Sequence, residues 1–276
     1  MQSTPNRRPE VPAVDSRPAR KESPSAETHR NLSRTRLSTS RRGVGRWAYP
    51  SAAGLLATAL AVGLAPGYAQ AVPSTPGCAD VEVIFARGTF EGPGVGKVGQ
   101  AFVDALQARL SDRTVGVYPV NYPASVDFGR AADGVVDASN HIRDVAQRCP
   151  GTQIVLGGYS QGAAVSGYVT ADTVPPGYVL PAGFSEPMPA QVADHVAAVT
   201  LFGKPTAPLI TALKRDAPPL AIGAPYANKT LELCAPADPV CQTGGLDRAA
   251  HSAYPTNGMT LQAADFAAQQ ILNRES

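Results

Sequence analysis

The 276-residue sequence lacks the features that mark several common classes of protein. Its longest apolar run, around residues 52–64, falls short of the roughly 20 residues that a comfortable membrane span needs. Its four cysteines form no CxxC pair and have no histidines near them, so the spacing of a zinc site is missing. No internal repeat is visible. Nothing in the sequence calls for a metal or an organic cofactor.

Positive charge is also scarce outside the N-terminal region. Residues 1–71 hold 11 of the 24 basic residues but only 4 of the 22 acidic ones, so the rest of the chain is mildly acidic. That part has no evident basic patch, and we expect no nucleic-acid partner.

The first 71 residues have the character of a leader. Residues 1–50 are rich in Arg, Ser and Pro and almost without apolar periodicity, which predicts disorder. Residues 51–71 follow several arginines, are apolar at their centre and end in Ala69-Gln70-Ala71, as an export signal does. We expect cleavage after Ala71, secretion to the cell envelope or the medium, and a single domain at 72–276. An uncleaved membrane anchor is the alternative.

Strands alternate with helices in the remaining chain, which predicts an α/β fold with a parallel sheet covered on both sides. The expected strands are Val81–Phe85, Thr114–Val120, Gln153–Gly158, Val196–Phe202 and Thr230–Leu233. Helical spacing is expected around 102–110, within 128–148, at 161–171, and in a last helix with one face formed by Leu261, Ala264, Ala268 and Ile271.

The four cysteines all lie in the part expected to be exported, where an even number favours two disulfides. Cys234 and Cys241 are close enough in sequence to close a small ring. This leaves Cys78 with Cys149, which precede the first and third strands and meet at one sheet edge if those strands are neighbours.

The segment Gly158-Tyr159-Ser160-Gln161-Gly162 is G-x-S-x-G at a strand-to-helix junction, the context in which this pattern predicts a nucleophilic serine. Small neighbours permit the sharp turn that exposes the Ser160 hydroxyl. An ordinary serine that caps a helix is the alternative.

A serine nucleophile needs a base, and the chain has four histidines. The chain order serine, acid, histidine selects His251, in a loop before the last helix. His29 lies in the leader, and we interpret His141 and His195 as solvated or helix-end histidines.

The acid is predicted to be Asp238, because the Cys234–Cys241 ring with its two prolines restricts the conformations of that carboxylate. Asp247 is nearer to His251 in sequence but lies in no such ring. The donors for an oxyanion are expected to be the N–H of Gln161, directly after the nucleophile, and Thr89, in the loop after the first strand.

One competing motif is present. Gly94-Val95-Gly96-Lys97-Val98-Gly99 matches G-x-G-x-x-G between a strand and a helix, a pattern found in dinucleotide-binding sites. The loop before it is too long for the tight turn, and no acidic residue closes the second strand, so we do not expect a nucleotide site.

Four motifs together resemble the cutinase family of small serine esterases, most of all the cutinase-like proteins exported by mycobacteria and related actinobacteria. They are ARGTFE (86–91), GYSQGA (158–163), CAPADPVC (234–241) and AAHSAYP (249–255). The resemblance implies a three-layer α/β-hydrolase-type sandwich with a central five-stranded parallel sheet. It also implies a triad of Ser160, His251 and Asp238, oxyanion donors at Thr89 and Gln161, and the same two disulfides.

The expected activity is hydrolysis of carboxylic and lipid esters of short to medium chain length, by a monomer that contacts lipid interfaces transiently. An acetylxylan-type deacetylase and a catalytically silent cell-surface binding protein are the alternatives. The charged pair Asp247-Arg248 stands where plant-polymer cutinases carry an apolar loop, which argues against cutin as a substrate. The Pro-rich segment Val174–Pro189, with Tyr178, Leu180, Phe184 and Met188, either contacts the acyl group or covers the helix beneath it.

Overall fold

Five parallel strands form the central sheet of the computed structural model, which describes residues 77–176, 179–184, 186–214 and 216–274. The strands lie in the order β2-β1-β3-β4-β5. Their bounds are β1 Val81–Ala86, β2 Val115–Pro119, β3 Gln153–Tyr159, β4 Val196–Phe202 and β5 Thr230–Leu233. All five expected strands are therefore present, and β4 is apolar almost throughout because both faces of the sheet are covered.

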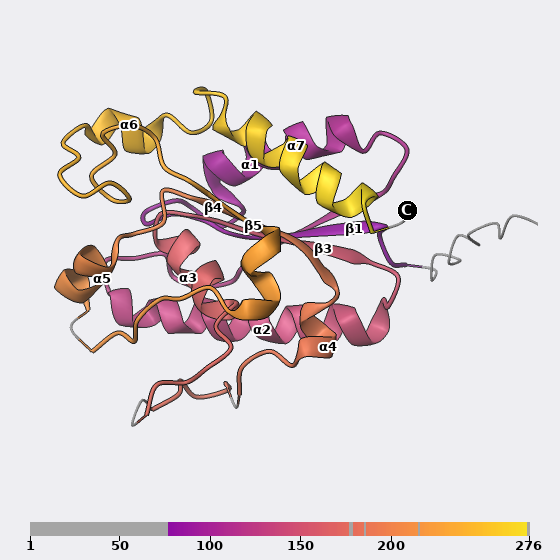
Figure 1. Ribbon diagram of the computed structural model, residues 1–276, viewed down its shortest axis with the longest axis horizontal. Helices are drawn as coiled ribbons and strands as arrows, with labels where there is room; N and C mark the ends of the chain where they lie inside the picture. Colours follow the sequence, from indigo (N-terminus) through magenta and orange to yellow (C-terminus); the bar gives the residue numbers. More distant parts are fainter. Residues whose placement is uncertain (1–76, 177–178, 185, 215, 275–276) are drawn as a thin grey trace, which may run out of the picture. The chain divides into compact units, whose positions relative to one another are not determined.

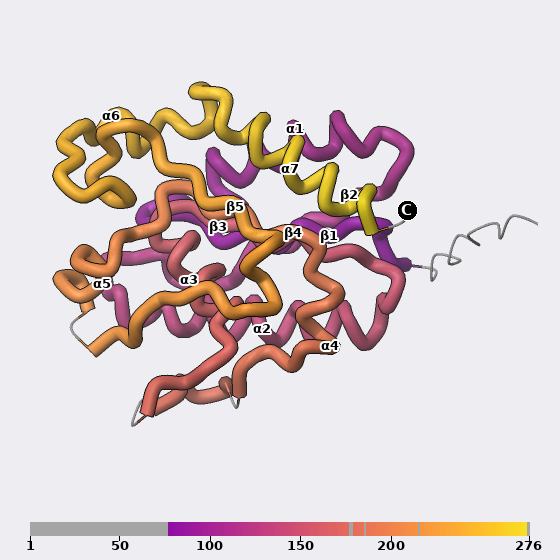
Figure 2. The backbone as a smooth tube through the Cα atoms, in the orientation of Figure 1, coloured from indigo at the N-terminus to yellow at the C-terminus, as the bar shows by residue number. Residues whose placement is uncertain are grey.

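Helices cover the two faces of the sheet and produce three layers (Figures 1 and 2). Helices α1 (Gly96–Arg109) and α7 (Met259–Leu272) pack on one face, and α2 (Ala131–Arg148) and α3 (Gln161–Val169) pack on the other. In β1 the side chains alternate between the two cores: Phe85 points to the α1 side and Ile84 to the α2 side. The predicted three-layer α/β-hydrolase-type sandwich is confirmed.

Short elements that the sequence did not indicate join these layers. They are the helices α4 (Ala190–Ala193), α5 (Ala207–Leu213) and α6 (Arg248–Ser252), with 3₁₀ turns η1 (Phe128–Arg130) and η2 (Ala224–Lys229). His251 was expected in a loop and lies instead in α6. A five-residue helix is too short to show a periodic apolar pattern, which is why the sequence did not reveal it.

One predicted core position is wrong. Leu261 of α7 is 52% exposed, whereas Ala264, Ala268 and Ile271 are buried as expected. The buried stripe of this helix begins at Thr260, which occupies the inward position one residue earlier. Leu261 therefore lies beside the stripe.

Both predicted disulfides are present, each with a Cα–Cα distance of 5.7 Å. Cys78–Cys149 joins the chain before β1 to the chain before β3, and these two strands are hydrogen-bonded neighbours from Val81 opposite Gln153 onward. Cys234–Cys241 closes the small ring after β5.

The described residues all belong to the second of two units into which the chain divides, residues 66–276. The predicted disordered leader, export signal and cleavage site at residues 1–71 lie outside the described residues, as does Tyr178. Within the described ranges no helix is long and apolar enough to cross a membrane, and no cluster of His, Cys, Asp and Glu could hold a metal ion.

Candidate active site

The candidate site lies at the carboxyl edge of the sheet, where loops after β1, β3, β4 and β5 meet. Ser160 follows β3 directly and has φ 55° and ψ −119°, a strained conformation for a residue with a side chain. Its N–H donates to the carbonyl of Phe202, the last residue of β4, at 2.9 Å. The sheet and the start of α3 thus fix the turn that presents the hydroxyl.

Two glycines make this turn possible. A Cβ on Gly158 would lie 2.2 Å from the carbonyl oxygen of Gly162, and a Cβ on Gly162 would lie 2.0 Å from the carbonyl oxygen of Ala86. No side chain fits at either place. The G-x-S-x-G spacing therefore reflects close approach of backbone on both sides of Ser160.

His251 lies between Ser160 and Asp238. Its Nε2 is 2.9 Å from the Ser160 Oγ, and its Nδ1 is 2.8 Å from Oδ2 of Asp238. The hydroxyl of Tyr159 donates to the carbonyl oxygen of His251 at 2.6 Å, and the two rings lie 5.0 Å apart. The structure thus brings together the three residues that the sequence selected, and it holds the backbone of the histidine as well.

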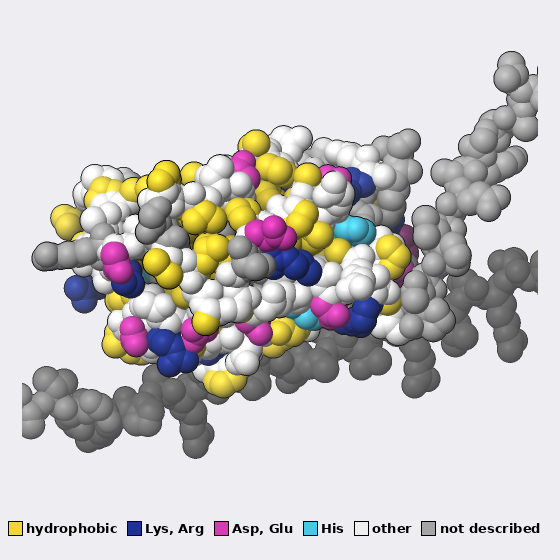
Figure 3. All heavy atoms as spheres, turned by 90° about the horizontal axis from the view of Figure 1, so that it is seen from below, with side chains coloured by type: hydrophobic (Ala, Val, Ile, Leu, Met, Phe, Trp, Pro, Cys, Tyr) yellow, Lys and Arg dark blue, Asp and Glu magenta, His cyan; other side chains and the backbone are white. Residues whose placement is uncertain are grey.

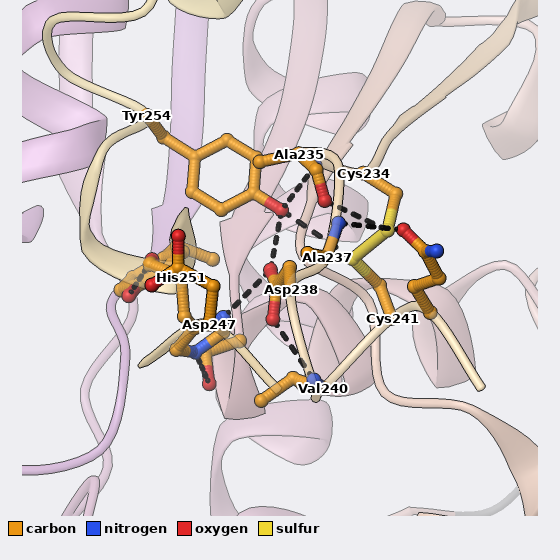
Figure 4. A network of polar contacts seen from close by, with 12 residues as sticks. Cys234, Ala235, Ala237, Asp238, Val240, Cys241, Asp247, His251 and Tyr254 are labelled. Atoms are coloured by element: carbon orange, nitrogen blue, oxygen red, sulfur yellow. Dashed lines mark hydrogen bonds and ion pairs between the residues drawn. A yellow bond between two sulfur atoms is a disulfide. The ribbon is translucent and has the colours of Figure 1, made fainter. Parts of the chain in front are cut away.

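Asp238 is fully buried inside the Cys234–Cys241 ring (Figure 4). Its Oδ1 accepts the N–H of Val240 at 2.8 Å, and its main-chain N–H donates to Ala235 at 3.0 Å. The carboxylate is held by its own loop as well as by the histidine. Asp247, the rejected alternative, accepts the N–H of Ala249 and so caps α6.

Tyr254 is a member of this network that sequence reasoning missed. Its hydroxyl donates to Oδ2 of Asp238 at 2.6 Å and accepts the N–H of Ala235 at 3.0 Å (Figure 4). Burial and the hydrogen bond to the carboxylate raise the pKa of Tyr254. Tyr254 stands in the AAHSAYP motif with His251, but it lies after the end of α6, so its contact with Asp238 depends on the fold of the loop.

Gly203, directly after β4, was also missed. It has φ +57°, and a Cβ there would lie 3.1 Å from Cε1 of His251 and 3.2 Å from Oδ2 of Asp238. The absence of a side chain lets the imidazole and the carboxylate meet above the end of β4.

The loop that carries Thr89 is fixed by a buried arginine. The Arg87 guanidinium donates to the carbonyls of Glu91, Val120 and Tyr122 at 2.9, 3.3 and 2.6 Å, and the Tyr122 hydroxyl donates back to the carbonyl of Arg87. Burial raises the pKa of Tyr122. Thr89 therefore lies in a loop braced from within, and both Thr89 and Gln161 line the same pocket as Ser160.

Gln161 is the first residue of α3, where a backbone N–H has no intrahelical acceptor. Its side chain is buried and donates through Nε2 to the carbonyl of Ser125 at 3.0 Å. That bond directs the side-chain amide of Gln161 toward the chain after β2.

The family model for cutinase matches residues 77–271. The chain belongs to the cutinase family. Among curated relatives, the probable carboxylesterase Culp5 of Mycobacterium tuberculosis is 49% identical over 176 residues, 64% of this chain and 98% of the relative. Carboxylesterase Culp1 of the same species is 46% identical over 218 residues, 79% and 93% of the two chains. Phospholipase Culp4 is 47% identical over 206 residues, 74% and 84% of the two chains.

Solved structures agree with this assignment. A Trichoderma reesei cutinase in complex with a phosphonate inhibitor is 34% identical, with a TM-score of 0.54 over 70% of this chain and 77% of that one. The catalytic core of the T. reesei acetyl xylan esterase is 26% identical, with a TM-score of 0.56 over 70% and 99%. This cutinase-family protein is a carboxylic ester hydrolase, as predicted.

The G-x-G-x-x-G motif of this esterase has a structural role. The carboxylate of Glu91 accepts the N–H of Gly88 and that of Lys97, each at 2.7 Å, so the chain's own carboxylate occupies the N-terminus of α1. A Cβ on Gly96 would lie 2.2 Å from that carboxylate. The place where a phosphate would bind in a nucleotide site is therefore filled.

The histidines outside the site of this esterase differ from expectation in one case. His141 was expected to be solvated or at a helix end, but it lies within α2, where its Nε2 is 2.6 Å from Oε1 of Glu82 and its ring stacks on Tyr118 at 3.4 Å. Helix α2 thus contacts Glu82 of β1 and Tyr118 of β2 through this face, an arrangement that the sequence alone did not predict. His195 precedes β4 and is half-buried.

A pocket of about 300 Å³ opens beside Ser160. Its lining is largely apolar and includes Phe128, Tyr168, Leu209, Ile210, Leu213 and Val240. Such a lining suits the hydrocarbon part of an ester better than a sugar.

Proposed function

We propose that this esterase cleaves its substrates through an acyl-enzyme at Ser160, with His251 as base and Asp238 as the acid that orients it. The continuous chain of hydrogen bonds from the Ser160 Oγ through the imidazole to the buried carboxylate, at 2.9 and 2.8 Å, carries this proposal.

The reaction follows from these contacts. Nε2 of His251 takes the proton of Ser160 as Oγ attacks the ester carbonyl, and Asp238 stabilises the imidazolium that forms. The main-chain N–H of Gln161 and the N–H and hydroxyl of Thr89 hold the oxyanion. The imidazolium then gives its proton to the leaving alcohol. A water molecule, deprotonated by the same nitrogen, releases the acid.

The proposed substrates are carboxylic and lipid esters with acyl groups of short to medium length. The apolar pocket beside Ser160 supports this choice, as does the similarity to the carboxylesterase Culp1 and the phospholipase Culp4. Phe90 and Leu246, which are 80% and 90% exposed, would meet a lipid interface transiently. We further propose that the protein is exported, since its two disulfides suit an oxidising compartment, and that it acts as a monomer.

A deacetylase of the acetylxylan type is the second candidate, favoured by the likeness to the T. reesei acetyl xylan esterase core. A series of p-nitrophenyl esters from acetate to palmitate, measured with wild type and Ser160→Ala, separates the two. We expect kcat/KM to rise from acetate to octanoate and to fall by at least about a thousandfold in Ser160→Ala. Activity confined to acetate would favour the deacetylase, and full activity in Ser160→Ala would contradict the acyl-enzyme at this residue.

A further inference from the structure

A second pocket, of about 130 Å³, lies next to the one beside Ser160. The two pockets share lining from Phe128, Ala131, Tyr168, Lys214 and Ala217. The same five residues thus lie between the two spaces, and the second pocket is on their side away from Ser160, which lines only the first.

The second pocket is apolar. Its floor includes Ala132 and Val135 of α2, and its outer wall includes Leu180 and Phe184 of the Pro-rich segment. Among the described residues that line it, Lys214 alone carries a charge, and its ammonium group is paired with the exposed Asp216. A lysine can lay its hydrocarbon stem along an apolar surface while its ammonium group stays at the water. Figure 3 shows the α2 side of the domain, where hydrophobic side chains gather in the middle of the face.

Side chains of α2 and α3 fix the segments around this pocket by hydrogen bonds to their main-chain carbonyls. The Tyr168 hydroxyl of α3 donates to the carbonyl of Pro218 at 2.7 Å. Arg143 of α2 donates to the carbonyl of Glu186 at 2.9 Å, and its guanidinium lies 5.8 Å from the centre of the Phe184 ring. Met188 is buried in the core on this side of the sheet. The segment thus covers α2, which was one of the two expectations for it, and it also lines the second pocket.

The position of His251 shows which half of an ester would enter. The histidine must give a proton to the leaving alcohol, so the alcohol lies on the side of the imidazole. His251 is not among the described residues that line either pocket, whereas Ser160 and both proposed oxyanion residues line the first. We therefore assign both pockets to the acyl half of the ester.

We propose that the second pocket binds the distal methylenes of a long acyl chain, which passes over Phe128 and Tyr168 from the first pocket. The proposal rests on the acyl-enzyme at Ser160 and extends its substrates from medium to long acyl esters. Each methylene that leaves water can raise kcat/KM by up to about fourfold, so a few buried methylenes suffice for a measurable preference.

The test fills the second pocket without touching the first. Ala132 lines only the second pocket, and Ala132→Phe should lower the ratio of kcat/KM for p-nitrophenyl palmitate to that for the butyrate ester by about tenfold or more, both in mixed micelles. The matched control is Ala108→Phe, on the exposed side of α1 across the sheet, which should keep the wild-type ratio. An unchanged ratio in Ala132→Phe would overturn the proposal.

A second variant covers the case in which Ala132→Phe does not fold, as judged by a thermal melt. Leu180→Asp places a charge in the same pocket from the surface segment and should give the same selective loss. An unchanged ratio in this variant also overturns the proposal. Failure of the proposed function would give a different result. The butyrate ester would then not be hydrolysed by the wild-type protein, or it would still be hydrolysed by Ser160→Ala.

Discussion

The hydroxyl of Tyr254 lies 2.6 Å from Oδ2 of Asp238, the same carboxylate oxygen that faces Nδ1 of His251. Two donors from one short stretch of chain thus converge on one buried oxygen. The tyrosine limits how the carboxylate can turn and so positions the oxygen that orients the imidazole.

Tyr254→Phe should lower kcat by about tenfold, because a hydrogen bond to a charged group contributes about 1.5–3 kcal/mol. KM for a butyrate ester should change little, since the hydroxyl touches no substrate. Steady-state kinetics measures both. The control is Tyr226→Phe, because Tyr226 is equally buried and its hydroxyl has no partner among the described residues. Equal losses of kcat in the two variants would contradict a positioning role.

The Cys234–Cys241 ring should matter more for rate than for stability. Replacing both cysteines by serine frees the loop around Asp238, so kcat should fall about tenfold while the melting temperature falls less than when the Cys78–Cys149 disulfide is removed. The control is the Cys78→Ser/Cys149→Ser pair, at the opposite edge of the sheet. Its loop spans 71 positions instead of 7, which makes its loss of stability roughly 2 kcal/mol larger.

Thermal melts and ester kinetics on the two double variants give the comparison. If the ring variant lost stability and rate in parallel, the ring would be a structural staple and would not position the acid.

Arg87→Lys should lower kcat by about tenfold or more with a smaller change in KM. Lysine cannot donate to the three carbonyls that the buried guanidinium now contacts, so the loop around Thr89 would lose its brace. Ester kinetics at saturating butyrate tests this. Arg148→Lys, at an exposed ion pair with Asp144, is the matched control and should leave kcat unchanged. A purely raised KM in Arg87→Lys would contradict a role in holding the oxyanion.

Stability should fall in alkaline solution. Burial raises the pKa of Tyr226, so this phenol stays protonated in the folded chain after it has ionised in the unfolded one. The unfolded state then binds fewer protons, and the free energy of unfolding decreases as pH rises above about 10. Tyr226→Phe should make this decrease shallower, as measured by urea unfolding across that range. An unchanged slope would show that Tyr226 is not one of the groups responsible.

The sequence predicted the sheet, both disulfides and the convergence of Ser160, Asp238 and His251, because strand patterns and fixed-order motifs carry that information locally. It did not predict Tyr254 or Gly203, whose roles depend on how the loop after β5 folds back over the end of β4. Leu261 was wrongly placed on the buried face of α7, because the adjacent Thr260 takes the inward-facing position. The role of Glu91 at the N-terminus of α1 also depends on the path of the loop, since Lys97 lies six positions further along the chain.

The most direct test of the central claim is to map the adduct of a fluorophosphonate by peptide mass spectrometry and to follow its rate of formation. We expect a single adduct on Ser160 that explains the loss of esterase activity. We also expect the adduct to form at least about a hundredfold more slowly in His251→Ala. Loss of activity with the label on another residue, or labelling of Ser160 at an equal rate in His251→Ala, would contradict a Ser160 nucleophile activated by His251.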